Sequence, residues 1–170
     1  MKLIDWLKEK VTQDKRAHQW FENDESEDRI VRAYKELLSG YEDEPATLLK
    51  TTRLISKGEK PSLVTVSDIN FYSICAHHFL PFYGKISITY LPGTRIIGLG
   101  KFPRLVQAYS RRFQIQEDLV KEIAEELMGS GGATGVKVVA DARHMCMCSR
   151  GPSDQTAMTR TEHQLGDISI

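Results

Sequence analysis

The chain has 170 residues, 41% of them hydrophobic, which is typical of one domain with a substantial core. Its 23 basic residues balance its 23 acidic residues, so the overall charge does not predict binding to nucleic acid or another polyanion. Residues 1–10 are too charged for a secretory signal, and no apolar run approaches the roughly 18 residues of a membrane span. We therefore expect a cytoplasmic protein whose three cysteines stay reduced.

The first third of the chain is predicted to be helical. Four apolar residues recur there at helical spacing: Leu3, Trp6, Leu7 and Val11. A second helix is predicted to begin near Asn23-Asp24 and to end at Gly40, where a glycine favours termination.

Strand patterns begin after residue 62. Apolar and β-branched runs at 63–69 and 84–90 predict two strands, and a turn at Pro92-Gly93 precedes Ile96-Ile97. Two helical stretches follow at 102–109 and 119–127.

The last third of the chain returns to strand character. Val136, Val138 and Ala140 alternate with their neighbours, which predicts a strand with one buried face. A polar run at 154–161 predicts one more strand or an ordered arm. This order of elements predicts an α+β fold, with helices on one face of a mainly antiparallel sheet.

Potential metal ligands gather in two distant clusters. Cys75-Ala76-His77-His78 and the segment 144–150 together hold every cysteine of the chain and three of its five histidines. The two-residue gap between Cys75 and His78 lets both side chains turn toward one ion, as in many zinc sites. We therefore predict a zinc site that takes a third ligand from the second cluster.

The arrangement of the second cluster depends on its secondary structure. If residues 143–150 form a strand, its period of two places His144, Cys146, Cys148 and Arg150 on one face. Such a face combines metal binding, proton transfer and anion recognition.

Two simpler interpretations of the clusters stay open. One is a structural zinc closed by four ligands, namely Cys75, His78, Cys146 and Cys148. Residues two apart on a regular strand are roughly 6.5 Å apart, however, which is awkward for two sulfurs on one ion. The other is a set of buried cysteines and hydrogen-bonded histidines without a metal.

Several segments resemble the GTP cyclohydrolase I family in type, order and spacing, over residues from about Asp24 to Gly166. They are Ser73 to Lys85, Gly98-Leu99-Gly100-Lys101, Tyr109-Ser110-Arg111-Arg112, Gln114-Ile115-Gln116-Glu117 and His144-Met145-Cys146-Met147. The resemblance implies the tunnelling fold for a core at residues 62–166, preceded by a helical part at 1–40 within a single domain over 1–170. It also implies a toroidal homodecamer with sites at subunit interfaces.

The resemblance further implies a reaction and a metal. GTP and water give 7,8-dihydroneopterin triphosphate and formate, at a Zn²⁺ ion held by Cys75, His78 and Cys146, with water in the fourth position. His77 matches the family's proton-transfer residue, a role that suits an imidazole at neutral pH. His144 matches a residue placed near the ribose and ring-opening steps, or else supports the zinc ligands from behind.

Substrate-binding residues follow from the same resemblance. Glu117 matches the residue that accepts two hydrogen bonds from the guanine edge, although a glutamate there also stabilises a helix N-terminus. Gln116 is its weaker companion. Three basic residues match the family's phosphate contacts, namely Lys101, Arg104 and Arg150. Arg29 and Arg32 match further basic positions that reach a neighbouring subunit's site, although a solvated helix face suits them as well.

Two residues depart from the family pattern. Ala76 stands where the motif usually has a glutamate, and Gly100 stands where a serine usually precedes the phosphate-binding lysine. We therefore keep two further hypotheses. One is a diverged enzyme that acts on another purine nucleotide or stops at a ring-opened formamide; the other is a non-catalytic, zinc-stabilised binding protein.

Overall fold

The computed structural model describes residues 2–23 and 25–168. Over these residues the chain divides into two compact units, Met1–Glu36 and Leu37–Ile170. The single domain expected over 1–170 stays a prediction, and each unit is described by itself.

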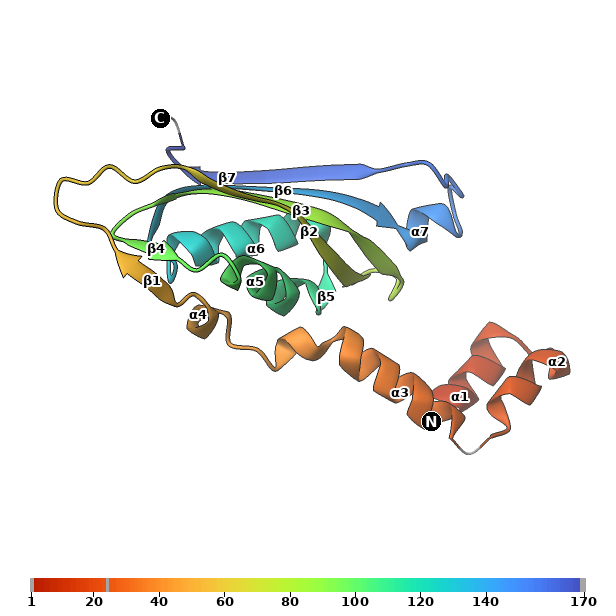
Figure 1. The fold of residues 1–170 in the computed structure, drawn as a ribbon. Helices are drawn as coiled ribbons and strands as arrows, with labels where there is room; N and C mark the ends of the chain where they lie inside the picture. Colours follow the sequence, from red (N-terminus) through yellow and green to blue (C-terminus); the bar gives the residue numbers. More distant parts are fainter. Residues whose placement is uncertain (1, 24, 169–170) are drawn as a thin grey trace. The chain divides into compact units, whose positions relative to one another are not determined.

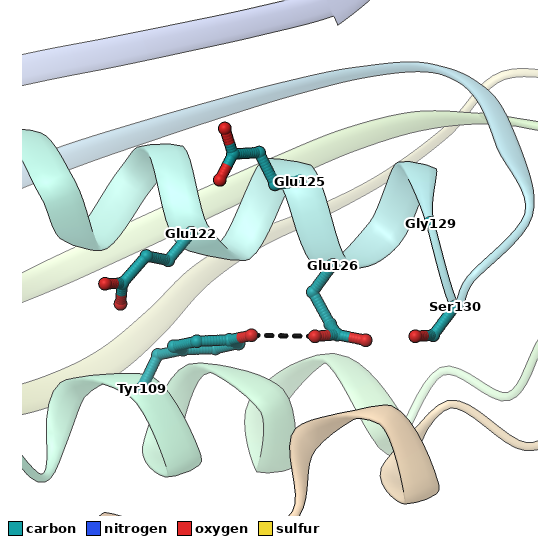
Figure 2. Close-up of a pocket in the computed structure, with 6 residues that line it drawn as sticks. All are labelled: Tyr109, Glu122, Glu125, Glu126, Gly129 and Ser130. Carbon is teal, nitrogen blue, oxygen red and sulfur yellow. Dashed lines mark hydrogen bonds between the residues drawn. The ribbon is translucent and has the colours of Figure 1, made fainter.

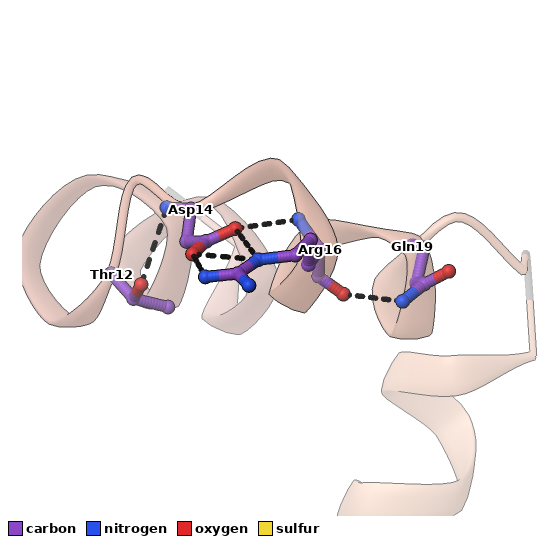
Figure 3. A network of polar contacts seen from close by, with 4 residues as sticks. All are labelled: Thr12, Asp14, Arg16 and Gln19. Carbon is purple, nitrogen blue, oxygen red and sulfur yellow. Dashed lines mark hydrogen bonds and ion pairs between the residues drawn. The ribbon is translucent and has the colours of Figure 1, made fainter.

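The first unit is helical, as expected. Its elements are α1 (Leu3–Trp6), the π-helical turn η1 (Leu7–Val11), α2 (Lys15–His18), the 3₁₀ turn η2 (Gln19–Phe21) and most of α3 (Ser26–Leu37). Asp14 begins α2, because its carboxylate accepts a hydrogen bond from the backbone N–H of Arg16 at 2.8 Å. The same carboxylate pairs with the Arg16 guanidinium (Figure 3).

Helix α3 begins and ends inside the predicted bounds. The predicted start included Asp24, which lies outside the described residues, whereas the helix begins at Ser26. Asn23 explains this start, since its side-chain oxygen accepts from the Glu25 N–H at 2.8 Å and forms a turn before the helix. After Leu37 the chain tightens into the 3₁₀ turn η3 (Ser39–Tyr41) around Gly40.

The second unit contains a five-stranded sheet in the order β5-β2-β3-β6-β7. Its strands are β2 (Val64–Cys75), β3 (Pro81–Pro92), β5 (Phe113–Gln114), β6 (Ala133–His144) and β7 (Thr159–Gly166). The pairings are antiparallel except for the short parallel contact of β5 with β2. The predicted alternation in β6 is confirmed, because Val136, Val138 and Ala140 are completely buried.

Helices α5 (Lys101–Ser110) and α6 (Gln116–Met128) lie on one face of this sheet (Figure 1). Their apolar residues and the inward side chains of β2, β3 and β6 form one core. A second sheet pairs β1 (Thr51–Leu54) with β4 (Arg95–Ile97), and α4 (Pro45–Leu48) precedes β1. The expected α+β architecture is therefore confirmed.

The strands are long, so the two ends of the sheet lie far apart. Twelve residues of β3 span about 37 Å. Cys75 and the start of β3 lie at one end. At the other end the Ile97 N–H donates to the Tyr90 hydroxyl at 3.2 Å, just before α5 begins. Helix α5 then returns, since Arg112 beyond its end accepts a hydrogen bond from the Ile74 N–H.

The expectation that residues 143–150 continue the strand is wrong. Strand β6 ends at His144, and residues 145–148 form a helical turn, α7 (Met145–Cys148), as Figure 1 shows. The Ser149 N–H donates to the Met145 carbonyl at 2.9 Å, so the backbone hydrogen bonds are satisfied locally and not by a neighbouring strand. The face expected to carry His144, Cys146, Cys148 and Arg150 therefore does not exist.

Across residues 2–23 and 25–168, no helix combines the length and apolar character that crossing a membrane requires.

Candidate metal centre

The turn between β2 and β3 positions the first two candidate ligands. The Phe79 N–H donates to the Cys75 carbonyl at 2.9 Å, which winds residues 75–79 into one helical turn. The turn ends at Phe79, whose φ of 57° is left-handed, and the Cys75 N–H then donates to the Leu80 carbonyl. Residues three apart on a helical turn share a face. Accordingly, Sγ of Cys75 lies 3.7 Å from Nδ1 of His78.

Helix α7 supplies the third candidate ligand. Its first turn follows directly on His144, whose strand pairs with the start of β3, so Cys146 is carried toward Cys75. Cys75, His78 and Cys146 each offer one ligand atom, and these three atoms all lie within 4.8 Å of one another. Within the described part of the chain Cys148 is not a member of this group.

These donors suit zinc. Two thiols and one imidazole are ligands that Zn²⁺ prefers, and three protein ligands are the number typical of catalytic zinc sites. Tetrahedral bonds of about 2.0–2.3 Å place ligand atoms roughly 3.3–3.8 Å apart, so small side-chain rotations suffice to close the group. Both cysteines are buried, whereas His78 is exposed, which leaves the site accessible from one side.

The electrostatics of the group favour a cation. Burial, and next the neighbouring thiol of Cys75, raise the pKa of the Cys146 thiol, while Arg150 acts in the opposite direction. Two adjacent thiolates repel each other in a buried place, and a bound cation removes that repulsion. Without a cation, the Cys146 thiol is therefore biased toward its protonated form.

His77 lies beside the metal group without being part of it. Its side chain is exposed, and its Nδ1 is 4.0 Å from Sγ of Cys75. The rings of His77 and His78 are inclined by 66°, with centroids 6.1 Å apart. Adjacent residues of a helical turn point to different sides, which explains why only one of the two joins the group.

His144 is held by two neighbours at the end of β6. Its ring stacks on Phe82, and its Nε2 is 2.7 Å from Oε1 of Gln116. Burial lowers the pKa of His144, and the nearby Glu117 carboxylate opposes that shift. The imidazole is therefore biased toward its neutral form. The sequence patterns identified His144 and Gln116 as separate candidates. They did not predict the contact between these two residues or the stacking of His144 on Phe82.

The first turn of α6 holds the two residues expected at the guanine edge. Gln116 is almost completely buried, whereas Glu117 is exposed at the surface. The carboxylate of Glu117 raises the pKa of His144 against the effect of burial, which links it electrostatically to that histidine. Arg150 is exposed just beyond α7 and likewise acts on Cys146.

The other expected basic residues are not brought to the metal group within this unit. Lys101 and Arg104 lie in the first turn of α5, and it is the other end of this helix that approaches Cys75, through the hydrogen bond of the Ile74 N–H with the Arg112 carbonyl. Arg29 and Arg32 lie on α3 in the first unit, where Arg29 donates to the Ser26 hydroxyl at 3.2 Å.

A separate pocket of about 290 Å³ lies between α5 and α6 (Figure 2). Three glutamates line it, and the Tyr109 hydroxyl donates to one of them, Glu126, at 2.7 Å. Burial, and next this hydrogen bond, raise the pKa of Tyr109. The contact ties the two helices together, so we interpret the pocket as part of their packing.

The family model and the similar curated proteins all point to the same family. The model of the family described as GTP cyclohydrolase I matches residues 6–169. The GTP cyclohydrolase 1 of Campylobacter lari is 44% identical over 140 residues, which are 82% of this chain and 73% of that protein. The GTP cyclohydrolase 1 of Chlorobaculum tepidum is 39% identical over 141 residues, covering 83% of this chain and 62% of that protein.

A solved structure supports the fold. The apo crystal structure of the archaeosine synthase QueF-Like matches 65% of this chain and 100% of its own, with a TM-score of 0.51 and 18% identity. That similarity confirms the expected tunnelling fold of the chain and carries no conclusion about its chemistry.

Proposed function

Because the chain belongs to the GTP cyclohydrolase I family, we propose that it is a zinc-dependent enzyme that converts GTP and water into 7,8-dihydroneopterin triphosphate and formate. The observation that carries the proposal is the group of Cys75, His78 and Cys146, with His77 beside it. The product is the first intermediate of pterin synthesis, and we place the enzyme in the cytoplasm.

The residues of this group would hold the zinc ion. When bound there, zinc supplies Lewis-acid chemistry and lowers the pKa of a coordinated water toward neutrality. The burial of both cysteines keeps competing water from their sulfurs. The exposed side at His78 gives the substrate access.

Two histidines are proposed to move protons. His77 is exposed and adjacent to the ligands, so it is suited to protonating nitrogen 7 of the purine, which makes carbon 8 more electrophilic. His144 is proposed to act in the ring-opening and ribose steps. Its stacking on Phe82 holds the imidazole plane, which favours a defined geometry for proton transfer.

Substrate recognition is proposed for Glu117 and a set of basic residues. The exposed carboxylate of Glu117 can accept two parallel hydrogen bonds from the guanine edge. Arg150 is proposed to contact phosphate from the same side. The role of Gln116 at the guanine stays a prediction, and its carboxamide already makes three hydrogen bonds inside the fold.

The remaining basic residues support a shared site. Lys101 and Arg104 lie at the start of α5, whereas the other end of that helix approaches Ile74 beside Cys75, so we propose that they serve a triphosphate at the site of a neighbouring subunit. We propose that Arg29 and Arg32 also reach a neighbour's site. This arrangement is supported by the family and fits a toroidal homodecamer.

A second candidate function is a reaction that ends early or takes another purine nucleotide. The residue that favours it is Gly100. A Cβ placed there would meet nothing within 4 Å, so packing would allow the serine that the family usually has at this position. The missing hydroxyl at Gly100 and the missing carboxylate at Ala76 are therefore chemical differences. A non-catalytic zinc protein has less support, since Cys148 does not complete a four-ligand group in the described residues.

One experiment separates these functions. The purified protein is incubated with GTP, formate and the pterin chromophore are measured in parallel, and bound metal is counted on the same sample. Formate and pterin in equal amounts support the proposal. Ring opening without formate supports the early-ending reaction, and a metal-loaded protein that leaves GTP unchanged contradicts the proposal and calls for a purine nucleotide screen.

A further inference from the structure

The carboxamide of Gln116 is fully engaged inside the fold. The residue is 1% exposed, and its Nε2 donates to the backbone carbonyls of Ala140 and Thr159, each at 3.0 Å. These carbonyls belong to the paired strands β6 and β7. The remaining polar atom, Oε1, lies 2.7 Å from Nε2 of His144.

The two carbonyls determine the orientation of the carboxamide. A carbonyl oxygen only accepts hydrogen bonds, so the NH₂ end of Gln116 must face Ala140 and Thr159. Turning the group by half a rotation would place Oε1 against two acceptors, and each buried group left unpaired costs about 1–3 kcal/mol. The oxygen of Gln116 therefore faces His144.

An acceptor facing Nε2 determines where the imidazole carries its proton. Oε1 can only accept, so Nε2 of His144 must donate and must carry hydrogen. In the neutral ring, Nδ1 is then the nitrogen that carries the lone pair. Stacking on Phe82, with planes 5° from parallel, holds the ring in the plane that this hydrogen bond needs.

We infer that Gln116 is a positioning residue that fixes the orientation of the His144 ring and its Nε2–H tautomer, so that Nδ1 is the nitrogen left to face the substrate. The inference rests on the proposed function in one respect, because that function supplies the substrate whose sugar hydroxyl Nδ1 would face.

The tautomer can be read directly, without substrate. The zinc-loaded protein is labelled with ¹³C and ¹⁵N in histidine and measured by solid-state NMR, which does not depend on the size of the oligomer. A His144→Asn sample identifies the His144 signals by their loss. We expect a protonated Nε2 and an unprotonated Nδ1. A ring with a bare Nε2 and a protonated Nδ1 would overturn the inference.

A matched pair of variants tests the positioning role. Gln116→Met removes the acceptor and keeps the side-chain length, whereas Gln114→Met removes a buried carboxamide that bonds to Tyr109 and Glu122 instead. We expect Gln116→Met to populate both tautomers and to lower kcat about 10- to 100-fold, with KM and zinc content little changed. Gln114→Met should keep the Nε2–H signal.

The possible results distinguish a failure of the inference from a failure of the proposed function. Equal losses of kcat in the two variants, or full kcat in Gln116→Met, would reduce Gln116 to a packing residue. If Gln116→Met does not fold, the wild-type spectrum still decides. An Nε2–H signal in a protein that never releases formate contradicts only the function. Formate release with the opposite tautomer contradicts only the inference.

Discussion

The imidazole ring of His144 lies flat on the phenyl ring of Phe82, with ring centroids 4.5 Å apart and planes 5° from parallel. The two residues face each other in the pairing of β3 with β6, and Phe82 is completely buried. Because the phenyl ring is enclosed by the core, it holds the imidazole above it in one plane. The position of a proposed proton-transfer group thus depends on the packing of the sheet.

Replacing Phe82 by leucine should therefore lower both stability and turnover. The smaller side chain leaves a cavity and removes the stacking, which should cost about 1–3 kcal/mol in the free energy of unfolding. Turnover should fall about tenfold as His144 gains freedom. Urea denaturation and initial rates measure the two effects. Phe71→Leu is the control, since Phe71 is buried on β2 and packs edge-on against Phe82; an equal loss of turnover there would contradict the role of the stacking.

Metal content should separate the ligands from their neighbours. Cys75→Ser, His78→Ala and Cys146→Ser should each lower bound zinc well below that of the wild type, because each removes a donor from a group of three. His77→Ala and Cys148→Ser should keep the metal. Elemental analysis of the purified proteins measures this without any activity assay. Zinc lost from His77→Ala would show that the ligands are wrongly assigned.

Glu117 should affect substrate binding in a way that its neighbour does not. Both Glu117 and Asp118 are exposed acidic residues in the first turn of α6, so both stabilise the helix N-terminus to a similar degree. Glu117→Ala should raise KM and lower kcat/KM at least tenfold, since guanine N–H groups lose their acceptor. Asp118→Ala should leave both constants nearly unchanged. Similar effects in the two variants would indicate a role in the helix alone.

The pairing of β6 with β7 should weaken in acid. Arg160 donates to both carboxylate oxygens of Asp141 at 2.8 Å across the two strands, and this hydrogen bonding lowers the pKa of Asp141. Because the pKa of Asp141 is lower in the folded state, its ionised carboxylate stabilises the fold at any pH above its pKa in the unfolded chain, which is near 4. This contribution is lost as the pH falls through the pKa of the folded state. Denaturation from pH 7 to about pH 3 should show wild-type stability converging on that of Asp141→Asn. A constant difference between the two proteins would contradict the assignment.

Much of the fold was predictable because its signals are local. The alternation in β6 and the apolar spacing of α5 and α6 each occur within one element, and all three elements were found. Strands β1 and β5 were missed, since four and two residues give too short a pattern. They are strands only through their partners β4 and β2, which lie far away in sequence.

The candidate metal group was predictable from residue type, but its surroundings were not. The spacing of Cys75 and His78 predicts a shared direction, which the helical turn confirms. The change from strand to helix after His144 has no local signal in the Met-Cys-Met-Cys sequence. The contact of Gln116 with His144 joins residues 28 positions apart and depends on the packing of α6 on β6, which periodicity cannot specify.

A mixture of two inactive variants should recover activity if the site is shared between subunits. Lys101 lies at the end of α5 that is farther from Cys75, and His77 lies beside the metal group. Lys101→Ala and His77→Ala should each be nearly inactive when expressed alone. In mixed oligomers about a quarter of the sites would combine a wild-type Lys101 from one subunit with a wild-type His77 from its neighbour. Co-expression followed by rate measurement should therefore recover roughly that fraction. A site contained in one chain predicts no recovery, because every chain then carries one defect; mass spectrometry must confirm that the oligomers are mixed.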